Sequence, residues 1–303
     1  DRSGTIWHRP AKKSWRQAVN SLRHRHPKTS IGCLCSLFGK SREGYYSVSS
    51  RVLSERILTE VKVIGLVQEI RTLAPGISAY KLFLILRDIY EGKLMGRDRF
   101  YRLLRRKGLM LPALKRRHTT NSNHNYRMYK NRIKGYKPPT LNLLWVADIT
   151  YIETDDGICY LHLLTDAFTH EIVGWTLSES LVAENTLQAL NQAIAMFPEA
   201  DFTRLTHHSD RGAQYCCNRY VDRLKEMNIS ISMTEDGNPT DNAIAERVNG
   251  IIKQEWLYRE KRPGNIVEAR IRIARIIDFY NNIRPHRSNN MKTPKEMRVS
   301  AAA

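Results

Sequence analysis

The chain has 303 residues, a length sufficient for two or three domains. Hydrophobic residues make up 42% and charged residues 26%, a composition typical of a globular protein. Lys and Arg number 49 and Asp and Glu 30, so the formal net charge is +19. We expect no membrane span, because no apolar run approaches the roughly 18 residues that one needs. The five cysteines, two of them adjacent, favour a reducing cytoplasm over a secreted disulfide scaffold.

The charge is distributed unevenly along the chain. Residues 1–140 carry 31 basic and 8 acidic side chains, residues 141–245 carry 5 and 16, and residues 246–303 carry 13 and 6. The basic front and tail suit a polyanion such as nucleic acid, whereas an acidic centre would repel one unless cations neutralised it. The pattern therefore suggests a divalent-metal site that works on a phosphate backbone.

The basic N-terminal stretch carries signals for short helices. Residues 1–29 are rich in His and Arg, and we expect them to be loosely ordered or partly helical. A short helix is expected at 30–37, followed by a turn at Gly39 and a second short helix that displays Arg42 and Tyr45. This arrangement predicts a helix-turn-helix, whose second helix would enter a major groove of DNA.

Three longer helices are expected next, at residues 51–73, 78–90 and 97–107. The last two form a second helix-turn-helix candidate, and the sequence leaves open which candidate reads bases. DNA-binding side chains are expected on the final helix, namely Arg102, Arg105 and Arg106. Together these elements predict a helical DNA-binding region over residues 30–110.

A polar, basic stretch at residues 111–140 separates these helices from the next pattern. It ends in Pro138-Pro139 and is typical of a linker rather than a packed element. We expect it to follow a DNA backbone through Lys115, Arg116 and Arg117.

The pattern changes to β-rich segments at Leu143. Strands are expected at 145–154, 159–166, 172–178, 204–209 and 229–233, and helices at 183–196, 216–227, 242–256 and 266–283. Three antiparallel strands followed by alternating helices and strands predict a mixed α/β domain over residues 141–283. Residues 284–303 are expected to form an irregular basic tail, in which Arg284, His286 and Arg287 either contact DNA or are solvated.

Three acidic residues of the α/β domain are candidates for metal binding. Asp148 lies inside an apolar strand, where an ionised carboxylate is costly unless it is paired or metal-bound. Asp210 ends a strand, and Glu246 lies on a polar helix face with Asn249 and Lys253, side chains suited to a phosphate backbone. Two-metal phosphoryl transfer needs carboxylates from separate rigid elements. The alternative for each acid alone is a turn, a cap or a surface charge.

Other polar residues near these acids have simpler interpretations. His207 and His208 either orient a bound phosphate or finish a strand as partly buried residues. Asp166 is expected to cap the end of a strand, with a metal-binding role as the alternative. Asp241 is expected to cap the helix that carries Glu246.

Long segments of the chain resemble a known family. NLLWVADITYIETDDGICYLHLLTDAFTHEIVGW, LTHHSDRGAQY and SMTEDGNPTDNAIAERVNGIIKQE are similar to the catalytic core of insertion-sequence transposases of the OrfB type, in the DDE transposase and retroviral integrase superfamily. Asp210 and Glu246 are separated by 35 residues, a spacing typical of that family. The resemblance begins near residue 30 and continues through FYNNIRPHRSNNMKTPKEM.

The resemblance implies an RNase H-like core, a mixed five-stranded sheet flanked by helices. It implies that Asp148, Asp210 and Glu246 are the catalytic residues and hold two Mg²⁺ ions, for which Mn²⁺ can substitute. The implied reaction is Mg²⁺-dependent nicking at the ends of an insertion sequence, followed by attack of the freed 3′-OH on another phosphodiester. The implied partners are double-stranded DNA with terminal inverted repeats and further copies of the chain, as a homodimer or larger oligomer on the bacterial nucleoid.

Two departures from the family pattern affect what is expected upstream of the core. The His/Cys zinc module of retroviral integrases is absent from the N-terminal part of the sequence, which places the chain on the bacterial side of the superfamily. The chain starts at Asp1, so it could be the downstream part of a fusion with an OrfA product, or act with one as partner. Two other functions remain open, a structure-selective nuclease with the same core and a catalytically idle DNA-binding regulator.

Overall fold

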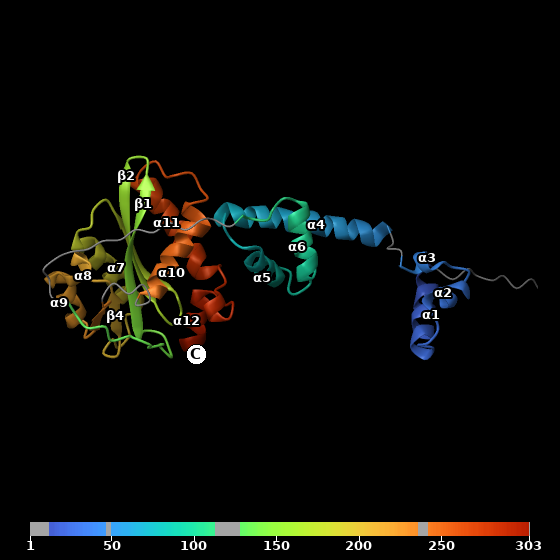
Figure 1. The fold of residues 1–303 in the computed structure, drawn as a ribbon, viewed down its shortest axis with the longest axis horizontal. Coiled ribbons are helices and arrows are strands. Elements are labelled where there is room, and N and C mark those ends of the chain that lie inside the picture. The colour runs from blue at the N-terminus through green and yellow to red at the C-terminus, as the bar shows by residue number, and fades with distance from the viewer. Residues whose placement is uncertain (1–11, 47–49, 113–127, 236–241, 303) are drawn as a thin grey trace, which may run out of the picture. The chain divides into compact units, whose positions relative to one another are not determined.

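The computed structural model describes residues 12–46, 50–112, 128–235 and 242–302 (Figure 1). The chain divides into two compact units, Asp1–Lys62 and Val63–Ala303, and each is described by itself. The sequence predicts a finer division into five segments, with boundaries after residues 29, 110, 140 and 283, and this division remains a prediction.

The first unit contains three short helices around a small core. They are α1 (Lys12–Arg25), α2 (Ile31–Ser36) and α3 (Arg42–Tyr46). Trp15 and Val19 lie four residues apart on one face of α1 and pack with Leu34 and Cys35 of α2. The N-terminal segment is therefore partly helical, as expected, and α1 shares a core with the two short helices that the sequence predicts.

Helix α4 (Ser50–Leu73) contains the boundary between the units, and its last turns belong to the second unit with α5 (Ala79–Ile89) and α6 (Arg97–Arg106). The chain leaves α4 at Pro75-Gly76, and Ser78 caps α5 by accepting a hydrogen bond from the Lys81 N–H. The buried side chains of α4, α5 and α6 join one hydrophobic cluster with those of the α/β domain. These three helices confirm the expected elements to within a residue or two. The connection from α5 to α6 spans residues 90–96, longer than the three- or four-residue turn of an ordinary helix-turn-helix.

The α/β domain is built on a mixed sheet of five strands, β1 (Leu144–Thr154), β2 (Gly157–Asp166), β3 (Ile172–Ser178), β4 (Thr206–Ser209) and β5 (Ser230–Met233). The strand order is β3-β2-β1-β4-β5. β1, β2 and β3 pair antiparallel, while β1, β4 and β5 pair parallel. This arrangement confirms the expected RNase H-like core.

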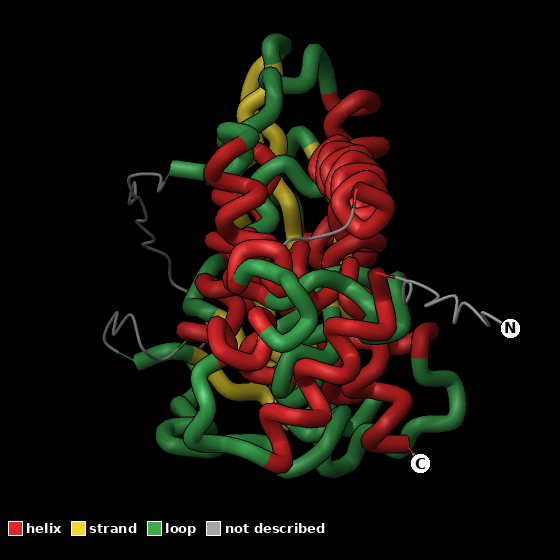
Figure 2. Tube along the Cα trace, turned by 90° about the vertical axis from the view of Figure 1, so that its right-hand side faces the viewer, coloured by secondary structure: helices red, strands yellow, loops and turns green. Residues whose placement is uncertain are grey.

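Helices cover both faces of the sheet (Figures 1 and 2). On one face, α7 (Ala183–Met196) and α9 (Asn218–Glu226) pack against inward side chains such as Trp145 and Leu164. On the other face, α10 (Ala243–Ile252), the π-helical turn η1 (Lys253–Leu257) and α11 (Ile266–Asn282) pack against Leu161 and Leu163. Leu163 and Leu164 thus point to opposite faces, as the alternation of strand side chains requires.

The structure corrects two of the expected elements. The helix expected at 216–227 is split into α8 (Ala213–Cys216) and α9, because Cys217 adopts extended backbone with ψ of 148°. The expected irregular tail is wrong. Residues 284–302 contain a short 3₁₀ turn (Arg287–Asn289) and α12 (Pro294–Ala302), whose start carries a capping box between Thr293 and Glu296.

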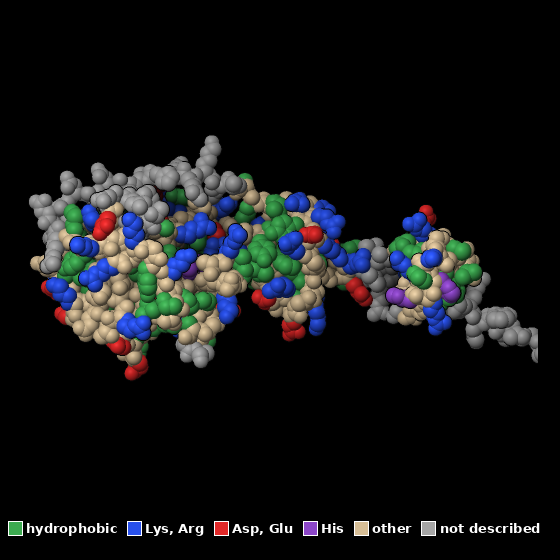
Figure 3. All heavy atoms as spheres, turned by 60° about the horizontal axis from the view of Figure 1, so that its bottom comes forward, with side chains coloured by type: hydrophobic (Ala, Val, Ile, Leu, Met, Phe, Trp, Pro, Cys, Tyr) green, Lys and Arg blue, Asp and Glu red, His purple; other side chains and the backbone are tan. Residues whose placement is uncertain are grey.

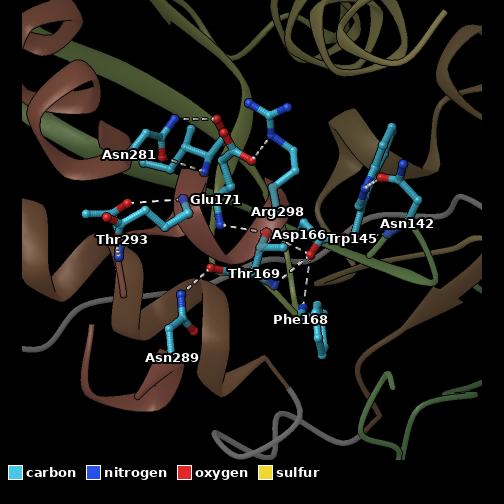
Figure 4. A network of polar contacts seen from close by, with 12 residues as sticks. Asn142, Trp145, Asp166, Phe168, Thr169, Glu171, Asn281, Asn289, Thr293 and Arg298 are labelled. Atoms are coloured by element: carbon cyan, nitrogen blue, oxygen red, sulfur yellow. Dashed lines mark hydrogen bonds and ion pairs between the residues drawn. The ribbon is translucent and has the colours of Figure 1, made fainter. Parts of the chain in front are cut away.

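A network of polar contacts ties this C-terminal segment to the β2–β3 end of the sheet (Figure 4). Asn289 donates to the Thr169 carbonyl at 2.6 Å, and Arg298 donates to Glu171 at 2.7 Å. Asn281 accepts from the Ile172 N–H and donates to its carbonyl, so one side chain satisfies both outward backbone groups at this point of edge strand β3. Of the helices that the structure describes, none is both long and apolar enough to cross a membrane.

Candidate active site

Asp148 lies on β1, the central strand of the sheet, with β2 on one side and β4 on the other. Its Oδ1 accepts from the Ile149 N–H at 2.9 Å, and its Oδ2 accepts from the Asn249 side-chain amide at 2.7 Å. The carboxyl group is partly buried and has two fixed donors. Its orientation is therefore set by the protein rather than by solvent.

Helix α10 is attached to β1 by two asparagines. Asn242 donates to the Ala147 carbonyl at 3.0 Å, and Asn249 donates to Asp148 almost two turns later. Glu246 lies between these two anchors on the same stripe of the helix, and its side chain is exposed. The anchors therefore hold the turn that carries Glu246 beside the strand that carries Asp148.

Asp210 directly follows β4, which pairs in parallel with β1 through Val146 and His208. Its Oδ1 accepts from the Gly212 N–H at 2.9 Å. A Cβ at Gly212 would lie 3.0 Å from the same oxygen and 2.3 Å from the Gln214 amide nitrogen, so a larger residue there would displace the Gln214 side chain and crowd the Asp210 carboxylate.

Asp210 and Glu246 both act electrostatically on Asp148. Burial raises the pKa of Asp148 to about 7, and the negative charge of Asp210 adds to the increase. The Asn249 and Ile149 hydrogen bonds oppose it, and Glu246 makes a smaller contribution that raises the pKa further. In the metal-free protein, Asp148 therefore titrates near neutral pH.

The chemistry of this site fits a hard divalent cation such as Mg²⁺. Its donors are carboxylate and amide oxygens, which Mg²⁺ prefers. Asn242 and Asn249 are buried, and within the described residues their Oδ1 atoms have no hydrogen-bond partner. Among those same residues, however, no three His, Cys, Asp or Glu side chains are already gathered closely enough to hold a metal ion.

Lys253 lies at the end of α10, close enough to Asp148 for the two charges to interact. Burial lowers the pKa of Lys253, while the negative charges of Asp148 and Glu153 oppose that decrease. Asn249, which we expected to face DNA, is instead buried and holds Asp148. Part of the polar stripe of α10 therefore faces the Asp148 carboxylate.

The expected DNA-binding residues lie in three different settings. Arg42 is exposed on α3, whereas Tyr45 is partly buried, with its ring 6.3 Å from that of Trp15 and its hydroxyl bonded to Asn20. The α6 arginines are exposed, as expected for DNA contacts: Arg102, Arg105 and Arg106. Three further candidates lie outside the described residues: Lys115, Arg116 and Arg117.

A surface groove of about 440 Å³ beside α6 was not expected from the sequence. It is lined by Tyr80, Arg97, Asp98, Tyr101, Arg102 and Arg105. Figure 3 shows this part of the second unit as a hydrophobic area with basic side chains at its rim. Tyr101 is four residues from both Arg97 and Arg105 and so shares their helix face, but Tyr80 is on α5, and only the packing of α5 against α6 brings it to the groove.

The remaining polar candidates have structural roles. His207 is buried with its Nε2 at 2.9 Å from the Tyr220 hydroxyl, and His208 is buried with its Nδ1 at 2.9 Å from Ser232. Asp166 accepts backbone hydrogen bonds from residues 142, 168 and 169, which confirms the expected cap (Figure 4). Asp241 lies outside the described residues.

Arg284 and His286 belong to a buried cluster rather than to a solvated tail. The exposed fractions of the two residues are 3% and 4%, so neither is available to DNA. Arg287, the third of these candidates, is exposed.

Comparisons with known proteins match the chain to integrases and transposases. Residues 138–239 match the family model described as "Integrase core domain", and residues 227–294 match a second model of that description. The chain is 38% identical over 266 residues to "Insertion element IS600 uncharacterized 31 kDa protein" of Shigella sonnei, covering 84% of this chain and 93% of the relative. It is 34% identical over 170 residues to "Putative transposase for insertion sequence element IS986/IS6110" of Mycobacterium tuberculosis (strain ATCC 25177 / H37Ra), covering 55% of this chain and 61% of that relative.

Among solved structures, the catalytic core domain of HTLV-2 integrase in complex with magnesium is similar, with 18% identity and a TM-score of 0.43. That match covers 54% of this chain and 99% of the integrase core. From the extent and identity of the sequence matches, the chain belongs to the insertion-sequence transposases of the DDE transposase and integrase superfamily.

Proposed function

We propose that the protein cuts DNA at the ends of an insertion sequence and joins the freed 3′ ends to other DNA, with Asp148, Asp210 and Glu246 as the catalytic residues. The observation that carries the proposal is the position of these acids. They come from a central strand, a strand end and a helix anchored to that strand, and the charges of Asp210 and Glu246 both act on Asp148. Burial and the neighbouring charges make ionised Asp148 costly, and a bound cation would offset that cost.

In this proposal, Asp148 and Asp210 are ligands held by the sheet, and Glu246 supplies a third carboxylate from α10. Asn249 keeps the Asp148 carboxylate oriented toward the site. When bound, two Mg²⁺ ions, or Mn²⁺ in their place, supply activation of the attacking water or 3′-OH and stabilisation of the leaving oxygen. Asp148 gives up its remaining proton to solvent on cation binding, because a cation favours the ionised carboxylate.

The proposed DNA path uses the basic side chains outside the acidic centre. Lys253 lies near Asp148 and is placed to meet a phosphate close to the reacting bond. The exposed arginines of α6 are further candidates for phosphate contacts, and the basic composition of residues 111–140 suits the same role. Two element ends must be held together for joining, so the proposal includes a dimer or larger assembly on the nucleoid.

Labelled duplex DNA that carries the terminal repeats of the element tests the proposal, with Mg²⁺ and with either the wild-type protein or the Glu246→Gln variant. Glu226→Gln is the matched control, because Glu226 is an exposed acid of the same domain on α9, which packs on the opposite face of the sheet from α10. We expect the wild-type and control proteins to join a 3′ end to new DNA and Glu246→Gln to join none.

Two other outcomes would replace the proposal. Nicking without joining by the wild-type protein would identify a nuclease. Binding without any product would identify a DNA-binding regulator.

A further inference from the structure

Three segments that are far apart in the sequence meet at the π-helical turn η1, at the end of α10: the corner between α4 and α5, η1 itself and the segment that follows α11. The Gly76 N–H donates to the Glu255 carbonyl at 2.7 Å, and the Trp256 indole donates to the Leu73 carbonyl at 2.8 Å. The corner between α4 and α5 is therefore hydrogen-bonded directly to η1.

The Glu255 carboxylate is the centre of this contact. Lys81 of α5 donates to its Oε1 at 2.7 Å, and Arg284 donates to both of its oxygens at 2.8 Å. Arg284 also reaches the Nε2 of His286 at 2.8 Å. Burial opposes ionisation of Glu255, but the hydrogen bonds and charge of Arg284, with those of Lys81, outweigh it and lower the pKa of this carboxyl group.

The contact leaves no room for adjustment at Gly76. A Cβ there would lie 2.4 Å from the Glu255 Cα and 2.5 Å from its carbonyl oxygen. Backbone therefore packs directly on backbone, and the α4–α5 corner cannot shift without shifting η1.

Helix α10 continues into η1 without a break, because Lys253 between them has helical backbone angles, φ of −63° and ψ of −48°. Tyr258 N–H donates to the Lys253 carbonyl, the i→i+5 bond of a π-turn. The same continuous helix thus carries Glu246 near its start and Glu255 near its end. Its first turns are attached to β1 by Asn242 and Asn249, and its last turn is attached to the α4–α5 corner.

We propose that Glu255 is a positioning residue, which transmits the placement of helices α5 and α6 through the α10–η1 helix to the Glu246 carboxylate. The inference rests on the proposed function, in which α6 contacts DNA and Glu246 is catalytic. DNA held by α6 then fixes α5, α5 holds Glu255 through Lys81, and Glu255 sets the position of the helix that carries Glu246.

A purely stabilising role would not require a buried carboxylate with two cationic partners. Buried ion pairs contribute little net stability, and well-packed apolar side chains often replace them without loss. A carboxylate with a bidentate arginine and a lysine instead permits only one arrangement of the three segments.

The test compares Glu255→Gln with Glu260→Gln, a matched control. Glu260 is the next glutamate along the chain, its side chain is 17% exposed against 16% for Glu255, and it also pairs with two cations, Arg272 and Arg275. Those two partners are on α11, so Glu260 lacks the link to α5. The measurements are the dissociation constant for duplex DNA, the single-turnover joining rate at saturating DNA and Mg²⁺, and the thermal midpoint.

We expect Glu255→Gln to lower the joining rate about 10- to 100-fold while the dissociation constant changes less than about threefold, because a displacement of about 1 Å at a catalytic group costs that much rate. Glu260→Gln is expected to join DNA at the wild-type rate. Equal rate losses in the two variants, or a wild-type rate for Glu255→Gln at a temperature where it is folded, would overturn the proposal.

Hydrogen exchange of the α10 amides in the absence of DNA provides a readout independent of chemistry. We expect faster exchange at residues 246–252 in Glu255→Gln, and in Gly76→Ala as a second variant, than in Glu260→Gln. Wild-type exchange in both variants would refute the role of Glu255. If the wild-type protein joined no DNA at all, the proposed function would fail, and the exchange measurement would still decide whether Glu255 controls α10.

Discussion

Replacing Asp148 with asparagine should stabilise the metal-free protein at alkaline pH. The folded protein raises the pKa of this carboxyl group from an ordinary value of 3.8 to about 7, mainly by burial and then by the charge of Asp210. Between pH 3.8 and about pH 7, the Asp148 carboxyl group has already lost its proton in the unfolded chain but still holds it in the folded protein. The free energy of unfolding therefore decreases as the pH rises through this range, and the loss is complete above about pH 7.

The size of the effect follows from the two pKa values. Each pH unit between 3.8 and about 7 is worth about 1.4 kcal/mol, so ionised Asp148 costs at most about 4 kcal/mol at pH 8. Partial access of water to the carboxylate reduces this figure. An asparagine side chain at this position keeps the shape of the aspartate but has one acceptor oxygen for two donors, so it keeps the hydrogen bond from Asn249 or from the Ile149 N–H and loses the other. That loss does not depend on pH, whereas the cost of the charge does.

Urea unfolding in EDTA at pH 5 and pH 8 measures this effect in the wild-type protein and in Asp148→Asn. Other buried acids with raised pKa values, Asp166 and Glu171, contribute equally to both proteins, so the difference between them isolates Asp148. We expect the stability of the variant relative to the wild-type protein to increase by about 2–3 kcal/mol from pH 5 to pH 8, because only the wild-type protein loses about 1.4 kcal/mol per pH unit up to about pH 7. An equal pH dependence in the two proteins would refute the electrostatic account of the site.

Three further predictions concern packing, the sheet edge and DNA binding. Gly174→Ala should destabilise the protein by about 3 kcal/mol or more in urea unfolding, because its Cβ would lie 2.0 Å from the Ala189 carbonyl oxygen. Gly250→Ala is the matched comparison, because the space around Gly250 is open, and it should stabilise the protein by about 0.5–1 kcal/mol. Asn281→Ala should cost about 1–3 kcal/mol in the same assay, since both backbone groups of Ile172 lose their partner; a change below about 0.3 kcal/mol would contradict this. Neutralising the exposed α6 arginines, as Arg102→Gln, Arg105→Gln and Arg106→Gln, should weaken DNA binding. The slope of log K against log salt should decrease in magnitude by about one for each lost phosphate contact. An unchanged slope would show that the DNA binds elsewhere.

The elements of the α/β domain were predictable because their signals are local. The β1–β2 hairpin follows from alternating apolar residues around Asp155-Asp156-Gly157, and α7 begins and ends where the helical pattern does. The break at Cys217 leaves no comparable signal, because only its backbone angles separate α8 from α9. Helix α12 does have a local signal in the sequence, because Thr293 and Glu296 are three residues apart and form a capping box. The basic composition of the tail favoured an irregular segment instead.

The side chains around the candidate site were harder to predict than the acids themselves. Helical periodicity placed Asn249 on a polar stripe with Glu246, and a polar stripe ordinarily faces solvent or a ligand. In the structure, part of this stripe faces the Asp148 carboxylate, so Asn249 is buried while Glu246 is exposed. That difference depends on how α10 crosses β1, which periodicity does not contain.

The contact at η1 could not be predicted for the same reason. Lys81, Glu255 and Arg284 are separated by up to about two hundred positions, and each alone has the appearance of a surface charge. Their common burial arises only when the α4–α5 corner and the segment after α11 both pack against the end of α10.

The most direct measurement of the central claim is the single-turnover joining rate of three variants, Asp148→Asn, Asp210→Asn and Glu246→Gln, on end-labelled terminal-repeat DNA with Mg²⁺. The account predicts that each variant still binds the DNA and that each joins less than about one thousandth of the wild-type amount, because the acids act as one site. A variant that joins DNA at the wild-type rate would show that its acid is not catalytic and would contradict the claim.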